Sequence, residues 1–338
     1  MARPLVTALI DTYNHQRFIA AAIESVLAQD FPAGKMEIVV VDDGSTDRTP
    51  ARVKAFGDRV RYIRKKNGGQ ASALNLGFEE SRGEIIVMLD GDDVWLPQKA
   101  RRVVEEFEKN PAAGMVFHPY QYWMQDEDAR ESDDQDDENG PQVDPAFRPL
   151  SGYLPDSSTA MRQFGGFGTC SMALRRKVAS ELFPIPASLK IFADCFLIAG
   201  AIFLAPVASI PECLTRYRHH NANLASISEL DMQRLAQRNE SFRVARQEIA
   251  DWLAGRGFRG SHPAADVLLR RMELVQRLLS FSLQAPGRAQ YFAYLRDHHR
   301  VYSPLWTVPR RFANRLTTVA ALILGYEYFL SFRQLYRA

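Results

Sequence analysis

The stretch that most constrains this chain is residues 85–97, which read Ile-Ile-Val-Met-Leu-Asp-Gly-Asp-Asp-Val-Trp-Leu-Pro. Its first five residues form a continuous apolar run, which is typical of a strand buried on both faces of a sheet. Three carboxylates, Asp90, Asp92 and Asp93, follow at the end of that strand. Crowded carboxylates repel one another, so we expect a cation there, and a hard divalent ion that bridges an anionic substrate is the natural candidate. The alternative is a solvated turn that caps the next helix.

Apolar runs and helical periodicity alternate along the N-terminal third of the chain. Strands are expected at 5–10, 37–41, 60–63, 85–89 and 115–117, and helices near 18–27, 49–56, 71–81 and 97–110. This alternation predicts an α/β fold with a mainly parallel sheet flanked by helices. Polar clusters at 11–14, 42–47 and 90–93 follow three of these strands. Ligands of parallel sheets bind outside the carboxyl ends of the strands, so these clusters predict one shared site.

The cluster after the second strand, Val39–Asp47, indicates nucleotide binding. It reads Val-Val-Val-Asp-Asp-Gly-Ser-Thr-Asp. A carboxylate at a strand end can accept a hydrogen bond from a base N–H group, and Gly44 allows close approach of the backbone. The alternative is an Asx turn that caps the following helix.

The composition sets the expected class and compartment. The chain has 338 residues, 46% of them hydrophobic, which permits a sizeable core. Residues 126–144 hold ten acidic side chains and one arginine, so we expect a mobile loop there and a basic remainder. The three cysteines, Cys170, Cys195 and Cys213, form no Cys-x-x-Cys pair, which favours reduced thiols. With no secretory leader and no apolar run long enough to span a membrane, we expect a cytoplasmic protein.

The order of the motifs resembles the family-2 glycosyltransferases. The motifs that carry this resemblance are Asp11-Thr12-Tyr13-Asn14, 41–47, 67–75, Gly83-Glu84 and 89–93. The resemblance spans roughly residues 4–225 and is strongest before residue 110. It implies a GT-A fold, a nucleotide-sugar donor and inversion at the anomeric centre. The motifs are not specific to one donor, and our hypothesis is a UDP- or dTDP-sugar. One departure is Asp11, where the family commonly has proline; its carboxylate is expected either to alter base contacts or to face solvent.

The resemblance also implies roles for particular residues. The expected donor-binding residues are Thr12, Tyr13, Asp42, Asp43, Gln70, Asn75, Asp90 and Gly91. Asp92 and Asp90 form the Asp-x-Asp pair, with Asp92 expected to coordinate Mn²⁺ or Mg²⁺ directly and Asp90 to bind the ribose or a metal-bound water. The cation would neutralise the donor diphosphate.

Two later segments complete the implied site. Phe192–Leu197 matches the position of the family's catalytic acid, with Ala193 replacing the first acid of the usual pair, so Asp194 is the expected general base. Its alternative role is to face the dipole at a helix N-terminus. His220 matches a recurring position in the segment that closes over the site. It is expected to complete the metal shell or contact the diphosphate, and the alternative is a structural histidine.

We expect two regions, a glycosyltransferase domain at 1–225 and a helical region at 226–338. The segment 305–338 has an apolar surface flanked by arginines and aromatic residues, which favours a helix lying in the inner face of the cell membrane. The alternative is docking on the core or on a second subunit of a homo-oligomer. The expected partners are a nucleotide-sugar donor and a glycan or lipid-linked acceptor, without nucleic acid. The rival functions are a non-catalytic sugar-nucleotide-binding protein on the same fold and, less favoured, a nucleotidyltransferase.

Overall fold

The computed structural model describes residues 4–124, 142–143, 152–163, 168–220, 232–284 and 286–302. The chain divides into two compact units, Met1–Ser226 and Ile227–Ala338. Most of the predicted acidic loop and the whole of 305–338 lie outside the described residues.

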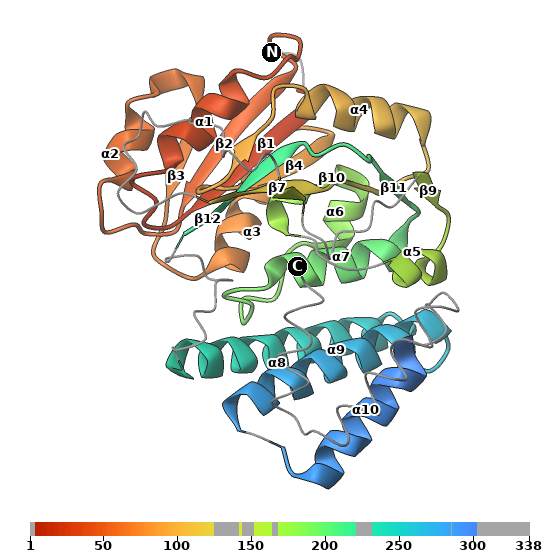
Figure 1. Cartoon of the computed structure of the whole chain (residues 1–338). Helices are drawn as coiled ribbons and strands as arrows, with labels where there is room; N and C mark the ends of the chain where they lie inside the picture. The colour runs from red at the N-terminus through yellow and green to blue at the C-terminus, as the bar shows by residue number, and fades with distance from the viewer. Residues whose placement is uncertain are drawn as a thin grey trace. The chain divides into compact units, whose positions relative to one another are not determined.

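The first unit is built on an eight-stranded sheet, coloured from red to green in Figure 1. Its strands, in spatial order, are β3 (Arg61–Arg64), β2 (Met36–Asp42), β1 (Val6–Thr12), β4 (Ile85–Asp90), β10 (Met172–Arg175), β6 (Met115–Phe117), β11 (Val207–Ser209) and β9 (Gly152–Leu154). The first four strands pair in parallel, and β10 runs antiparallel to both of its neighbours. The sheet is therefore mainly parallel, as the alternation of strands and helices predicted.

Helices cover both faces of this sheet (Figure 1). The helices of this unit are α1 (Ile19–Leu27), α2 (Thr49–Lys54), α3 (Gln70–Glu80), α4 (Lys99–Lys109), α5 (Ser157–Gln163), α6 (Arg176–Leu182) and α7 (Ala193–Leu204). The apolar residues of α1 and α4 share one core with Val6, Ala8 and Ile10, which are alternate residues of β1. On the other face, α3 packs closely enough that a side chain at Gly77 would collide with Leu9. Burial on both faces explains why these strands read as unbroken apolar runs.

A second sheet was not predicted from the sequence. Its strands, in spatial order, are β5 (Val94–Trp95), β12 (Thr215–His219), β7 (Tyr120–Met124) and β8 (Gln142–Val143). β5 and β8 could not be predicted, because each is two residues long and carries no alternating pattern. The pairing of β12 with β5 brings the C-terminal part of this unit beside the residues that follow β4.

The register of the main sheet brings the predicted polar clusters to one edge. Asp11 lies opposite Asp90 across the β1–β4 pair, and Thr12 lies opposite Asp42 across the β1–β2 pair. The carboxyl ends of β1, β2 and β4 therefore meet where the carboxylates are.

The second unit is helical. Its helices are α8 (Met232–Gly255), α9 (Pro263–Leu283) and α10 (Arg288–Tyr302). Leu274, Tyr291, Tyr294 and Leu295 form a small apolar core between α9 and α10. Among the helices that the structure describes, none combines the length and the hydropathy needed to cross a membrane.

Candidate active site

The carboxylates after β4 lie in a strongly acidic environment. Burial, followed by the charge of Asp92, raises the pKa of Asp11 to about 8. Burial also raises the pKa of Asp90 well above its usual range, and Asp11, Asp93 and Asp92 add to the effect. Burial and the neighbouring carboxylates thus disfavour the ionised forms of Asp11 and Asp90, and a bound cation would favour them.

Asp92 is the member of the cluster that stays ionised. Burial alone would raise its pKa, but His15 and His220 outweigh this effect and hold the pKa below its usual value. The Oδ2 atom of Asp92 lies 3.2 Å from Nε2 of His220 and 3.7 Å from Nε2 of His15. The imidazole of His220 also stacks on the ring of Phe18, with ring centroids 4.5 Å apart. The predicted metal residues Asp92 and His220 are thus brought together, and His15 joins them.

A buried lysine lies beneath this cluster. Lys99 is fully buried, and its Nζ donates to the carbonyl oxygen of Cys170 at 2.6 Å and to Oγ1 of Thr215 at 3.0 Å. It also lies 4.5 Å from the centroid of the Trp95 ring. Burial lowers the pKa of Lys99 to about 7, although nearby Asp93 opposes this shift.

Asp43 and Asp42 use their carboxylates to organise the loops at the end of β2. Asp43 accepts hydrogen bonds from Nζ of Lys65 and from the backbone N–H groups of Gly68 and Gly69. Asp42 accepts from the backbone N–H of Ser45 and from the hydroxyl of Tyr62. Since both carboxylates are buried and occupied in this way, they shape the predicted nucleoside site, and their direct contact with a base stays a prediction.

The end of β1 supplies the two other predicted nucleoside contacts. The side chain of Thr12 is buried, with Oγ1 3.3 Å from Nδ1 of His15, whereas the residue Tyr13 is 44% exposed. Gly91 packs against this strand end. A Cβ atom at Gly91 would lie 2.6 Å from Oγ1 of Thr12, so the absence of a side chain there lets the two strand ends approach each other.

Gln70 and Asn75 lie on α3 but make different contacts. Nε2 of Gln70 lies 3.3 Å from Oδ1 of Asp90 and 3.0 Å from Oγ1 of Thr169, which places Gln70 at the cluster. Asn75 instead donates to the carbonyl oxygen of Ile185 and accepts from its N–H group. Asn75 therefore holds the backbone at residue 185 in place. Its contact with the nucleotide sugar stays a prediction.

Asp194 lies in the first turn of α7 and belongs to the same electrostatic cluster. Its charge contributes to the raised pKa values of both Asp11 and Asp90. It follows Phe192, which has a left-handed backbone with φ 66°, an uncommon conformation for a bulky residue. Asp194 is half-buried.

The oxygen and nitrogen atoms near the ends of β1 and β4 are suitable ligands for a divalent cation. Asp92 and His220 offer a carboxylate oxygen and an imidazole nitrogen, and Oδ1 of Asp11 is a buried oxygen that accepts no hydrogen bond from the described part of the chain. Ligand atoms of Asp90, Asp93 and Cys170 also lie within 4.8 Å of one another. Burial raises the pKa of the Cys170 thiol, and a thiol is a soft ligand. A hard cation is therefore better matched by the oxygen and nitrogen atoms around Asp92.

Three residues that contact the cluster were not singled out in the sequence. His15 lies in the polar turn after β1, but its contact with Asp92 depends on the pairing of β1 with β4. Phe18 and Arg218 contact each other and the cluster through elements 200 residues apart in the chain. Of the segment that contains Arg218, only His220 had a predicted role.

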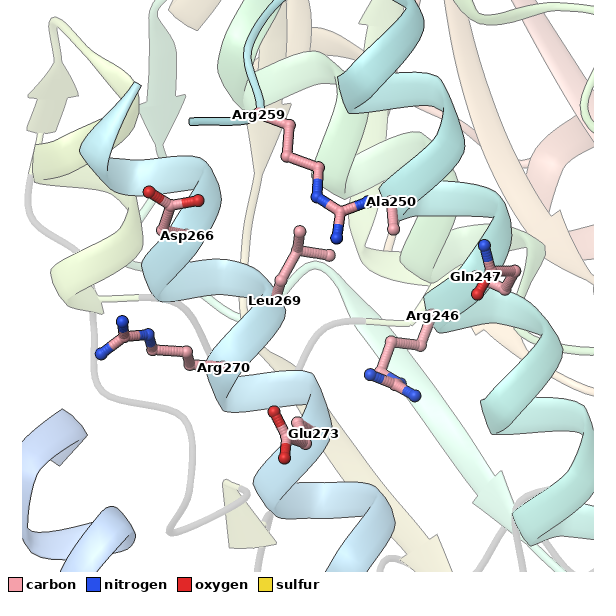
Figure 2. Close-up of a pocket in the computed structure, with 8 residues that line it drawn as sticks. All are labelled: Arg246, Gln247, Ala250, Arg259, Asp266, Leu269, Arg270 and Glu273. Carbon is pink, nitrogen blue, oxygen red and sulfur yellow. The ribbon is translucent and has the colours of Figure 1, made fainter. Parts of the chain in front are cut away.

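A separate polar hollow of about 390 Å³ lies in the helical unit. Figure 2 shows its lining side chains, which come from α8, α9 and the loop between these helices. Arg246, Arg259 and Arg270 face this space together with Asp266 and Glu273. Its charges are of mixed sign and it contains none of the predicted site residues, so the candidate active site is the carboxylate cluster.

Known proteins with similar sequences are glycosyltransferases. The sequence matches the family model described as Glycosyl transferase family 2 over residues 7–183, which contains the carboxylate cluster of β4. An uncharacterized glycosyltransferase of Nostoc is 32% identical over 75% of this chain and 77% of its own length. The succinoglycan biosynthesis protein ExoO of Rhizobium meliloti is 29% identical over 83% of this chain and 80% of its own.

Solved structures share the fold at low sequence identity. TarS 1-349 of S. aureus, crystallised with UDP, aligns with a TM-score of 0.62 and 15% identity, covering 95% of this chain and 92% of that chain. The mannosyltransferase PcManGT of Pyrobaculum calidifontis, in complex with GDP-Man and Mn²⁺, aligns with a TM-score of 0.54 and 20% identity. The alignment covers 98% of this chain and 84% of that chain. These likenesses establish the GT-A fold that the motifs predicted.

Proposed function

Because the chain belongs to glycosyl transferase family 2, it is a glycosyltransferase, and we propose that it moves a sugar from a UDP- or dTDP-activated donor to a hydroxyl group of a glycan or lipid-linked acceptor. The observation that carries this proposal is the convergence of Asp90, Asp92, Asp194 and His220 at one edge of the sheet. Membership of a glycosyltransferase family favours an enzyme over a non-catalytic protein that binds sugar nucleotides.

The proposed metal ligands are Asp92, Asp90 and His220, and the proposed ion is Mn²⁺ or Mg²⁺. Support comes from the distance of 3.2 Å between Oδ2 of Asp92 and Nε2 of His220. The burial and mutual repulsion of the carboxylates also favour a cation. The similar mannosyltransferase structure was obtained with GDP-Man and Mn²⁺. When bound, the cation would neutralise the donor diphosphate and the charge that develops on the leaving group.

Asp194 is the proposed general base of an inverting transfer. Its carboxylate takes the proton of the acceptor hydroxyl while that oxygen forms a bond to the anomeric carbon. The bond from this carbon to the nucleoside diphosphate breaks on the opposite face, and the electron pair leaves with the diphosphate. Thr12, Tyr13 and Asp43 are proposed to hold the nucleoside, and Gln70 and Gly91 to border the sugar.

The proposed process is the synthesis of a cell-surface polysaccharide or glycoconjugate. It is supported by the relative whose name assigns it to succinoglycan biosynthesis. A lipid-linked acceptor would bring the enzyme to the membrane, where we propose that residues 305–338 make peripheral contact.

A donor screen tests the proposal. Thermal shift with a panel of UDP-, dTDP- and GDP-sugars in the presence of Mn²⁺ should single out one donor, because a ligand that binds only the folded state raises its stability. The selected donor should then be turned over in a reaction that stops in excess EDTA. Binding of a donor without any turnover, with or without an acceptor extract, would instead support the non-catalytic alternative.

A further inference from the structure

Arg218 is an arginine almost completely removed from solvent, at 2% exposure. Charged groups are rarely buried to this extent unless hydrogen bonds and ring contacts compensate for the lost hydration. The backbone N–H of Arg218 donates to Oδ1 of Asp93 at 2.9 Å, and its side-chain Nε donates to the carbonyl oxygen of Asp92 at 2.9 Å. Main chain and side chain of this one residue therefore hold the turn that carries the proposed metal ligand Asp92.

The guanidinium group of Arg218 also contacts two aromatic rings. Its Cζ atom lies 4.0 Å from the centroid of Trp123 on β7 and 4.9 Å from that of Phe18, which precedes α1. A planar guanidinium suits such ring contacts, which an ammonium cannot reproduce in the same way. Phe18 in turn stacks on His220, with an interplanar angle of 29°. The same ring therefore touches both the arginine and the histidine that approaches Asp92.

We propose that Arg218 is a positioning residue that holds the imidazole of His220 against Asp92, so that both side chains are placed for a divalent cation before it binds; this inference rests on the proposed function. Two steps lead to it. Arg218 fixes β12 two residues before His220, through the contacts with Asp92 and Asp93. It also fixes the Phe18 ring on which the imidazole stacks. Partners of this kind orient metal ligands and commonly affect affinity 10- to 100-fold when they are replaced.

The test is the affinity for Mn²⁺ in the presence of UDP, measured by calorimetry or by the EPR signal of free Mn²⁺. The variant Arg218→Lys keeps the charge but loses the planar group. It should bind Mn²⁺ about 10- to 100-fold more weakly, while circular dichroism and melting show a folded protein. Arg175→Lys is the matched control. Arg175 also lies over an aromatic ring and donates to backbone carbonyls, but it pairs with Ile85 at the opposite end of β4, so its replacement should leave Mn²⁺ affinity unchanged.

A double-mutant cycle separates positioning from general damage. If Arg218 acts through His220, adding Arg218→Lys to His220→Ala should cost little further affinity. Full additivity of the two losses, or normal affinity of folded Arg218→Lys, would overturn the inference while leaving the proposed function standing. If the wild-type protein binds no Mn²⁺ with UDP, dTDP or GDP, both the inference and the proposed metal dependence are wrong.

Discussion

At the scale of single residues, the site is a balance of charges around Asp92. Two histidines keep this carboxylate ionised, while burial and mutual repulsion keep the pKa values of Asp11 and Asp90 high. A group that is already ionised can accept a cation without first losing a proton, whereas its neighbours release protons when the cation arrives. Asp92 is therefore the expected first point of contact for the metal.

Replacing Asp194 tests its role as the base. Asp194→Asn should lower kcat by about 10²- to 10⁴-fold, the usual contribution of general base catalysis, and should leave donor affinity nearly unchanged. The measurement is steady-state transfer together with donor binding by calorimetry. If donor binding collapses while the bound donor still turns over at a normal rate, Asp194 has a structural role instead.

Replacing Asp11 tests the charge balance through pH. In the folded protein its pKa is raised from 3.8 to about 8, so the folded state holds a proton that the unfolded state releases between these values. Stability conferred by this proton is present at low pH and is lost as pH rises towards 8. Asp11→Asn should therefore gain in melting temperature relative to the wild type between pH 5 and pH 8, measured in EDTA. A difference that is constant over this range would show that the pKa of Asp11 is not raised.

At the scale of elements, the site depends on close contact between the ends of β1 and β4. Gly91 permits this contact, because any side chain there would meet Thr12 and His15. The same contact places His15 near Asp92. The short β5–β12 pairing then brings His220 from the other side.

Adding one methyl group at Gly91 tests this arrangement. Gly91→Ala should destabilise the fold by about 1–3 kcal/mol, the usual cost of overpacking, and should also weaken Mn²⁺ binding. Gly168→Ala is the matched control, since a Cβ atom at Gly168 would meet no atom within 4 Å. Equal melting temperatures for both variants would show that the packing between β1 and β4 accommodates a Cβ atom at residue 91.

The elements that the sequence predicted are those with local signals. The apolar runs of β1, β2 and β4 and the carboxylates after them were sufficient to predict a parallel sheet with a site at its edge. The second sheet was missed because β7 and β12 pair across nearly a hundred residues. The contacts of Arg218 could not be predicted for the same reason, because they join distant parts of the chain. Asn75 was predicted to bind the sugar donor, but its side chain hydrogen-bonds to Ile185, 110 residues away.

At the scale of the whole molecule, the sequence predicts peripheral membrane contact through residues 305–338. The full chain should float with anionic liposomes at low salt, because arginines and aromatic residues flank the apolar part of this segment. A version ending at Pro304 is the control and should stay in the dense fraction. Equal behaviour of the two proteins would exclude this segment as the anchor.

We propose that this glycosyltransferase works through a cation held at Asp92, and the Mn²⁺ dependence of donor turnover tests this. The wild-type protein should require Mn²⁺ or Mg²⁺ and lose activity in EDTA, and Asp92→Asn should remain folded yet be inactive up to millimolar metal. Asp58→Asn, which changes an exposed carboxylate in the turn before β3, is the control and should behave as the wild type. Full turnover by Asp92→Asn in excess EDTA would show that the reaction needs no cation at Asp92.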